Sequence, residues 1–136
     1  GNVGIGTDTP VQKLDVRGTI GSGGVTYHSD VRWKRNIAQI SGALDTVSRL
    51  RGVRYEWRNE EFTDMDFADG EQLGVIAQEV EQVVPEVVST SAEGFKAVDY
   101  AKLTALLIES VKELKSENQA LKNRIDALEK AVGQNN

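Results

Sequence analysis

Apolar residues between positions 107 and 132 recur at alternating spacings of four and three, which is the heptad pattern of a coiled coil. At about 1.5 Å per residue, a helix over residues 100–132 is expected to be roughly 50 Å long. A helix that packs only on its own domain usually has a wider apolar stripe. We therefore predict a coil between copies of the chain, with its seam at Leu107, Val111, Leu114, Asn118, Leu121, Ile125, Leu128 and Val132.

The charged residues beside this seam favour a parallel coil. In a parallel, in-register coil, Glu117 lies opposite Lys122 of the neighbour, and Arg124 lies opposite Glu129. Both pairs have opposite charges, and such exposed pairs select orientation more than they stabilise. Asn118 in the seam costs stability and fixes the register, and by itself it favours two strands.

The rest of the chain divides into an arm and a small body. More than half of the thirteen glycines lie in residues 1–24, and the alternation over residues 11–16 predicts short strands. Two short strands cannot bury a core alone, so the arm must lean on the body or on partner chains. The expected domains are the arm at 1–28, the body at 29–99 and the coiled-coil helix at 100–136. The predicted fold class is α+β: a mixed helix and strand body, a glycine-rich β arm and a long C-terminal helix that forms the parallel coil.

Periodic patterns predict the elements of the body. Residues 37–50 carry apolar residues at helical spacing and predict an amphipathic helix of three to four turns. Residues 53–57 alternate and predict a strand. Residues 76–84 predict a second helix that ends at Pro85, and a strand at residues 95–98 follows a glycine turn. With only about 75 residues in the body, association through the coil must supply stability that the body lacks.

Composition excludes several classes of function. Because the chain has no cysteine and one histidine, we expect no disulfide, no thiol nucleophile and no zinc site. The net charge of −5, tripled in a trimer, disfavours nucleic acid and anionic membranes as partners. No apolar run approaches the roughly 18 residues of a membrane span. Because the chain starts at Gly1 without methionine, we expect it to be a fragment of a longer protein.

Three motif-like stretches predict no binding site. Gly4-x-Gly6 lacks the third glycine and the following helix of a dinucleotide site. The acidic loop at 59–71 resembles a calcium loop, but its glycine falls one position late and Val75 stands where glutamate belongs. The basic stretch from Arg32 to Arg58 includes aromatic residues, as in nucleic-acid-binding surfaces, but we expect it to face the acidic loop or solvent. No metal or other cofactor is expected.

Ser29 and Lys34 are a candidate nucleophile and base. A neutral lysine can take the hydroxyl proton, and the alkoxide then attacks a carbonyl. Lowering a lysine pKa from about 10.4 to about 7.5 by burial amounts to roughly 4 kcal/mol, so the pair requires a packed, assembled site. A spacing of five places the two side chains on different faces of a helix or strand. The segment must therefore bend, or the pair must form between chains.

Four motifs, in this order and spacing, resemble the peptidase S74 family. They are Ser-Asp-x-Arg-x-Lys at 29–34, Leu-Arg-Gly-Val-Arg-Tyr-Glu-Trp at 50–57, Gly-Val-Ile-Ala-Gln-Glu-Val at 74–80 with Pro-Glu at 85–86, and Val-Asp-Tyr at 98–100 before the coil. The family comprises intramolecular chaperone domains of phage endosialidases, tail spikes and neck appendages, and occurs in the membrane-anchored myelin regulatory factor. The resemblance covers about residues 27–115. The arm is similar to shaft segments of phage and bacterial fibre proteins.

The resemblance implies a homotrimer that directs folding of an upstream fibre or tail spike and then cleaves itself. Carried over, Ser29 is the nucleophile, Lys34 is its general base, and the expected cut is Ser29–Asp30. Attack on the preceding carbonyl would instead cut His28–Ser29. Asp30 and Arg32 would orient the site, and His28 is either a proton carrier or a bystander. The partners would be two further copies and the upstream fibre domain, in a virion tail or fibre or a bacterial surface fibre.

Two other functions stay open. The chain runs across the expected cut with the Ser29–Lys34 dyad intact. Either cleavage is slow or incomplete, or both fragments stay bound, or the chain is a structural trimerisation tip that never cleaves. A receptor-binding tip would need exposed aromatic loops, whereas we expect Trp33 and Trp57 to be core residues. Gln78 and Glu79 are expected to hold the fold or the trimer interface.

Overall fold

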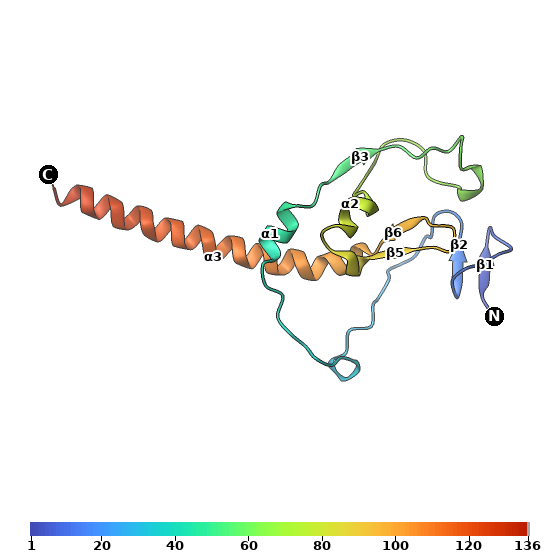
Figure 1. The fold of residues 1–136 in the computed structure, drawn as a ribbon, viewed down its shortest axis with the longest axis horizontal. Helices are drawn as coiled ribbons and strands as arrows, with labels where there is room; N and C mark the ends of the chain where they lie inside the picture. Colours follow the sequence, from blue (N-terminus) through green and yellow to red (C-terminus); the bar gives the residue numbers. More distant parts are fainter. Residues whose placement is uncertain (136) are drawn as a thin grey trace.

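The computed structural model describes residues 1–135, which form an arm, a small body and a long helix (Figure 1). Three one-turn 3-10 helices lie at Val31–Trp33, Thr63–Met65 and Pro85–Val87. The other elements are β1 (Val3–Ile5), β2 (Leu14–Val16), α1 (Ala43–Ser48), β3 (Val53–Tyr55), β4 (Gln72–Gly74), α2 (Ala77–Glu81), β5 (Val88–Thr90), β6 (Lys96–Val98) and α3 (Tyr100–Gly133). The predicted mixed helix and strand body with a long C-terminal helix is confirmed.

The strands form three separate pairs rather than one sheet. β1 pairs with β2 in parallel, β3 with β4 antiparallel, and β5 with β6 antiparallel. Each strand has three residues, and pairs this short cannot bury a core by themselves. The body therefore depends on the helix against which it is packed.

The first turns of α3 are the surface on which α1 packs. Leu106 and Ser110 are the buried residues of α3. On the same face, the carboxylate of Glu113 accepts the backbone N–H groups of Ala43 at 3.1 Å and Leu44 at 2.8 Å. The first amides of a helix have no intrahelical partner, and Gly42 at the N-cap has no side chain to offer. A residue of α3 thus caps α1.

The helix predicted across residues 37–50 is wrong in its extent, because α1 covers only Ala43–Ser48. Asn36 and Gly42 have φ values of 54° and 66°, in the left-handed region that a right-handed helix cannot contain. Ile37 and Ile40 therefore lie in an irregular segment despite their helical spacing.

The other predicted elements of the body are present, most of them shortened. β3 and β6 lie within the predicted strands at 53–57 and 95–98. α2 ends at Glu81, earlier than predicted, and Val84 has an extended φ of −137°. The cause is Pro85, which disfavours helical conformation in the residue before it.

The basic stretch and the acidic residues pair in part, as expected. Arg54 forms an ion pair with Glu71 beside β3 and β4, and the guanidinium of Arg51 contacts Glu79 of α2. The Arg51 hydrogen bond holds the pKa of Glu79 below its usual value. These pairs are exposed, so they fix local geometry more than they stabilise.

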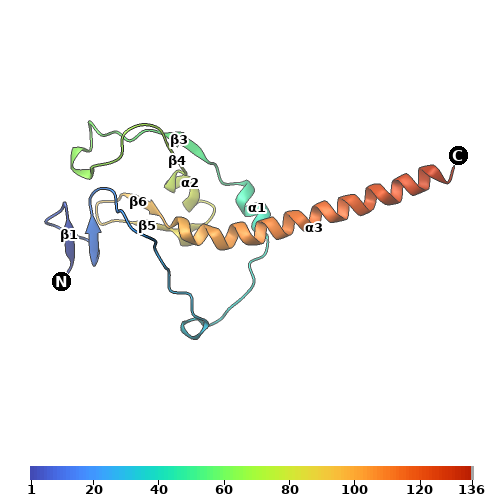
Figure 2. The same cartoon turned by 180° about the vertical axis from the view of Figure 1, so that it is seen from behind.

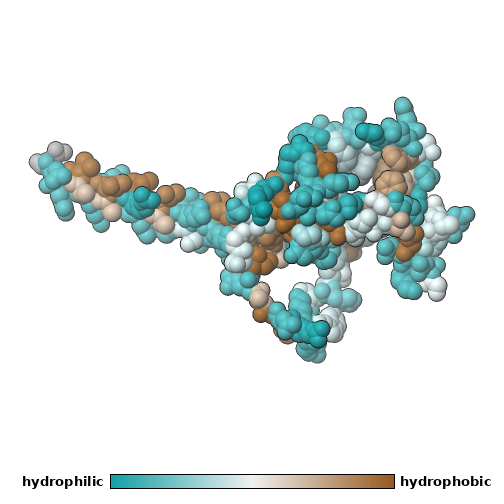
Figure 3. Space-filling view, in the orientation of Figure 1, coloured by the Kyte–Doolittle hydropathy of each residue, from teal (hydrophilic) through white to brown (hydrophobic). Residues whose placement is uncertain are grey.

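Beyond the body, the apolar side chains of α3 are exposed to solvent. Figure 3 shows a run of apolar atoms along the part of α3 that extends away from the body. The seam residues Leu121, Ile125 and Leu128 are 53%, 54% and 64% exposed. An apolar stripe of this length on a single chain marks an interaction surface. Among the described residues, no helix has an apolar stretch long enough to span a bilayer.

Glu113 provides a test of how the body is held. The backbone amides of Leu44 and Ala43 hold the Glu113 pKa below its ordinary value of 4.5. A lowered carboxylate pKa stabilises the fold above the unfolded-state pKa, and that contribution is lost as pH falls through the folded-state pKa. We expect the amides of α1 to exchange faster with solvent below about pH 4.5, and Glu113→Ala to produce the same change at neutral pH. Hydrogen exchange measures both effects.

Asp126→Ala, which removes an exposed carboxylate further along α3, is the matched control and should leave α1 unchanged. Equal protection of α1 in wild type and Glu113→Ala would show that the cap does not hold α1.

Candidate functional site

A 3-10 turn at Val31–Trp33 places the two predicted catalytic side chains together. Lys34 Nζ donates to Ser29 Oγ at 2.8 Å. The turn follows from its backbone hydrogen bonds, in which Trp33 N donates to Asp30 O at 3.2 Å and Lys34 N to Val31 O at 3.0 Å. The bend that a spacing of five requires is therefore present within one chain.

Asp30 and Arg32 hold this turn from its N-terminal end. Asp30 Oδ1 accepts Arg32 N at 2.9 Å and Arg32 Nε at 3.0 Å, and Oδ2 accepts Arg32 Nη2 at 2.7 Å. The Arg32 side chain holds the pKa of Asp30 below its usual value. Asp30 thus serves as N-cap and as ion-pair partner, which suits an orienting role for both residues.

His28 and Trp33 contact each other across the turn. Their ring centroids are 5.1 Å apart and the rings are nearly perpendicular, an edge-to-face arrangement. Trp33 is 68% exposed, so its expected place in the core is wrong for the single chain. Trp57 is 39% exposed and stacks on Phe67 with centroids 4.0 Å apart.

The dyad lies on an exposed loop outside the body. Figures 1 and 2 show the segment before α1 projecting away from α3 and the strands. Ser29 and Lys34 are both exposed. Water stabilises the ammonium form of lysine, so the pair needs a cover before Lys34 can act as a base.

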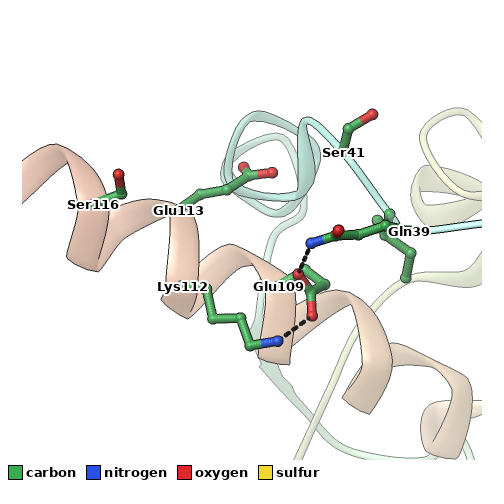
Figure 4. A pocket seen from close by; sticks show the side chains of 7 residues that line it. Gln39, Ser41, Glu109, Lys112, Glu113 and Ser116 are labelled. Atoms are coloured by element: carbon green, nitrogen blue, oxygen red, sulfur yellow. Dashed lines mark hydrogen bonds and ion pairs between the residues drawn. The ribbon is translucent and has the colours of Figure 1, made fainter.

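The C-terminal end of this loop is anchored on α3. Gln39 Nε2 donates to Glu109 Oε2 at 3.2 Å, and Lys112 Nζ donates to Glu109 Oε1 at 2.7 Å (Figure 4). These residues line a groove of about 370 Å³ with Ser41 and Ser116. Neither this groove nor the apolar one between α1, β4 and α3 is lined by the dyad.

In the described part of the chain, no three His, Cys, Asp or Glu side chains gather where they could hold a metal ion. The chemistry that the site offers is that of a hydroxyl and an amine.

Sequence reasoning missed the contacts that position the loop on α3. Gln39–Glu109 and the capping by Glu113 join residues about 70 positions apart, and neither carries a local sequence signal. In contrast, the ion pair between Asp30 and Arg32 joins residues only two positions apart, and both belong to the Ser-Asp-x-Arg-x-Lys motif.

Residues 29–89 match the model of the peptidase S74 family, described as chaperone of endosialidase. This segment belongs to the peptidase S74 family. The S74 segment begins at Ser29 and includes Lys34, the basic stretch, α2 and most of β5. The resemblance to this family is therefore confirmed, and the matched residues contain the first three of the four motifs.

Curated proteins similar to this chain include proteins of Dictyostelium discoideum and of phages. A myelin gene regulatory factor-like protein of Dictyostelium discoideum is 35% identical over 115 residues, which cover 79% of this chain and 12% of that protein. The long tail fiber protein Gp37 of Enterobacteria phage K3 is 32% identical, covering 74% of this chain and 8% of that protein. The long tail fiber protein Gp37 of Salmonella phage S16 is 33% identical, with 76% and 14% covered. The chain thus spans only a small part of these relatives' length.

Asp30 tests how the turn is held. In Asp30→Ala the backbone and guanidinium of Arg32 lose their common acceptor, so we expect the turn to loosen and the Lys34 backbone N–H to exchange faster. Hydrogen exchange by NMR measures this directly. Asp30→Asn keeps a side-chain acceptor for the cap but loses the ion pair, so its exchange rate should be intermediate. Exchange in Asp30→Ala as slow as in wild type would contradict this account of the turn.

Proposed function

We propose that this chain is an intramolecular chaperone of a fibre protein, which trimerises through α3, directs folding of the upstream fibre and then releases itself by autoproteolysis at Ser29. The observation that carries the proposal is the 2.8 Å hydrogen bond between Ser29 and Lys34 at the start of an S74 segment. Two of the relatives are long tail fiber proteins, which supports a virion tail fibre as the location, with a bacterial surface fibre as the alternative.

The proposed reaction uses only groups of this chain and water. Neutral Lys34 takes the proton of the Ser29 hydroxyl, and the oxygen attacks a carbonyl. Attack on the His28 carbonyl passes the acyl group from nitrogen to oxygen. Lys34 returns its proton to the freed amine, and water then hydrolyses the ester, which cuts His28–Ser29. A cut at Ser29–Asp30 needs a different attacking oxygen, because a serine attacking its own carbonyl would form a strained four-membered ring.

The proposed trimer rests on the exposed seam. The seam residues between Leu107 and Val132 recur at heptad spacing along one side of α3, and the large apolar ones among them are exposed. Burying each Leu or Ile between helices is worth about 1.5–3 kcal/mol. Residues of α3 that contact the body, such as Leu106 and Ser110, lie on an adjacent face. α3 can thus pack on the body of its own chain with one face and on the α3 helices of neighbouring copies with the other. Three strands, rather than two, is an inference from the S74 family.

Sedimentation equilibrium of Ser29→Ala, which should stay whole, tests the trimer. We expect about 45 kDa, three times the chain mass of 14.9 kDa. Leu121→Asp should dissociate it, because a carboxylate in the seam would be buried without a partner. Asp126→Ala, on the exposed side of the same helix, should stay trimeric. A mass of one or two chains for Ser29→Ala would contradict the proposed trimer.

An electrophoretic time course tests the cut. Wild type should yield fragments of about 3 and 12 kDa, in proportion to the 14.9 kDa of 136 residues. Ser29→Ala and Lys34→Ala should stay whole yet trimeric, since each removes a reacting group from an exposed loop. Leu121→Pro should also stay whole, although it touches neither dyad residue.

Intact-mass measurement of the fragments identifies the cut bond, since Ser29 stays with one fragment or the other. A wild type that stays whole under every condition would instead identify a non-cleaving trimerisation tip. Cleavage of Ser29→Ala would exclude Ser29 as the nucleophile.

A further inference from the structure

The loop between the arm and α1 exposes a set of large apolar side chains. They are between 65% and 70% exposed and lie before, between and after Ser29 and Lys34 in the sequence: Val25, Tyr27, Val31, Trp33 and Ile37. The only aromatic contact of Trp33 among the described residues is with His28 of the same loop. A loop of this composition in water is an interaction surface without its partner.

An apolar groove lies between α1, β4 and α3. Its volume is about 460 Å³, and Leu50, Leu73, Val75, Leu103 and Leu107 are among the residues that line it. Leu73 in β4 is 72% exposed. Leu107 is also the first seam residue, so the groove adjoins the surface through which α3 would pair. This continuity indicates that a neighbouring copy reaches the groove.

The loop of the same chain does not reach this groove. In Figures 1 and 2 the loop projects to one side of α3, while β3 and β4 lie on the other side. Its C-terminal end is tied to α3 through the Gln39–Glu109 hydrogen bond, and α1 begins at Ala43 a few residues later. Its own α3 therefore separates the loop from its own groove.

We infer that the groove is the docking site for the loop of a second copy of this chain, with Val31 and Trp33 as the anchoring side chains. The inference rests on the proposed trimer, because packed helices lie about 8–10 Å apart and bring the loop of one copy beside the body of the next. Each copy donates a loop and receives one, and a rotation of this kind closes into a ring.

Docking would also complete the reaction site. Ser29 and Lys34 lie on either side of the turn that carries Val31 and Trp33, so a body over that turn excludes water from the dyad. Burial disfavours the ammonium form of a lysine, which is the change that Lys34 needs. The cut would then wait for assembly, because the cover belongs to a neighbour.

Crosslinking tests the docking directly, since the natural chain has no cysteine. In the Ser29→Ala background, Val31→Cys is combined with Leu73→Cys and treated with a short thiol crosslinker. Denaturing gels should show covalent dimers and trimers. Val31→Cys with Val132→Cys, at the far end of α3, and Val31→Cys alone are the controls and should stay single chains. Sedimentation is measured on the same samples.

Crosslinking and sedimentation together distinguish failure of the docking inference from failure of the proposed trimer. A protein that sediments as a trimer but shows no crosslink, or only a link within one chain, overturns the docking and leaves the trimer standing. A protein that sediments as a monomer overturns both.

Leu73→Asp gives a second readout in the otherwise wild-type chain. Because Leu73 is largely exposed in the single chain, this variant should still fold and trimerise. We expect its self-cleavage to slow about tenfold or more, equivalent to roughly 1.4 kcal/mol in the barrier, since the carboxylate opposes docking of Trp33. Leu73→Met, and Leu14→Asp on the exposed arm, should cleave at the wild-type rate. A wild-type rate for Leu73→Asp in an intact trimer overturns the role of the groove.

Discussion

The size of the core is the constraint on which the rest of this structure depends. Four apolar residues are buried among the described residues: Ala43, Val80, Val87 and Leu106. Six three-residue strands in three separate pairs add little of their own. A body of this kind has too little buried surface to offset the entropy of folding, so α3 and, in the proposed assembly, neighbouring copies contribute the remainder.

α3 serves the body and the assembly with different faces. Glu113 and the buried Leu106 hold α1, while the seam that starts at Leu107 remains exposed. The loop that carries Ser29 and Lys34 runs from the arm to α1, and its large apolar side chains remain exposed. In this account the single chain is an incomplete unit, and both its stability and its chemistry depend on neighbours.

Sequence reasoning succeeded where the signal was local or periodic. The heptad pattern predicted α3 over nearly its full length, and the Ser29–Lys34 motif predicted two side chains that do meet. It failed for residues 37–50, where helical spacing of isoleucines could not reveal the left-handed backbone at Asn36 and Gly42. Trp33 was expected in a core because it lies within the motif, but it is 68% exposed in the single chain.

The central claim is that folding and association are one event, and the protein-concentration dependence of thermal unfolding tests it most directly. The non-cleaving Ser29→Ala chain, followed by circular dichroism over a hundredfold range of concentration, should melt in a single transition whose midpoint rises with concentration. The aromatic signal of the body should be lost in the same transition as the α3 helix. A midpoint independent of concentration, or a body that stays folded after α3 has melted, would contradict the account.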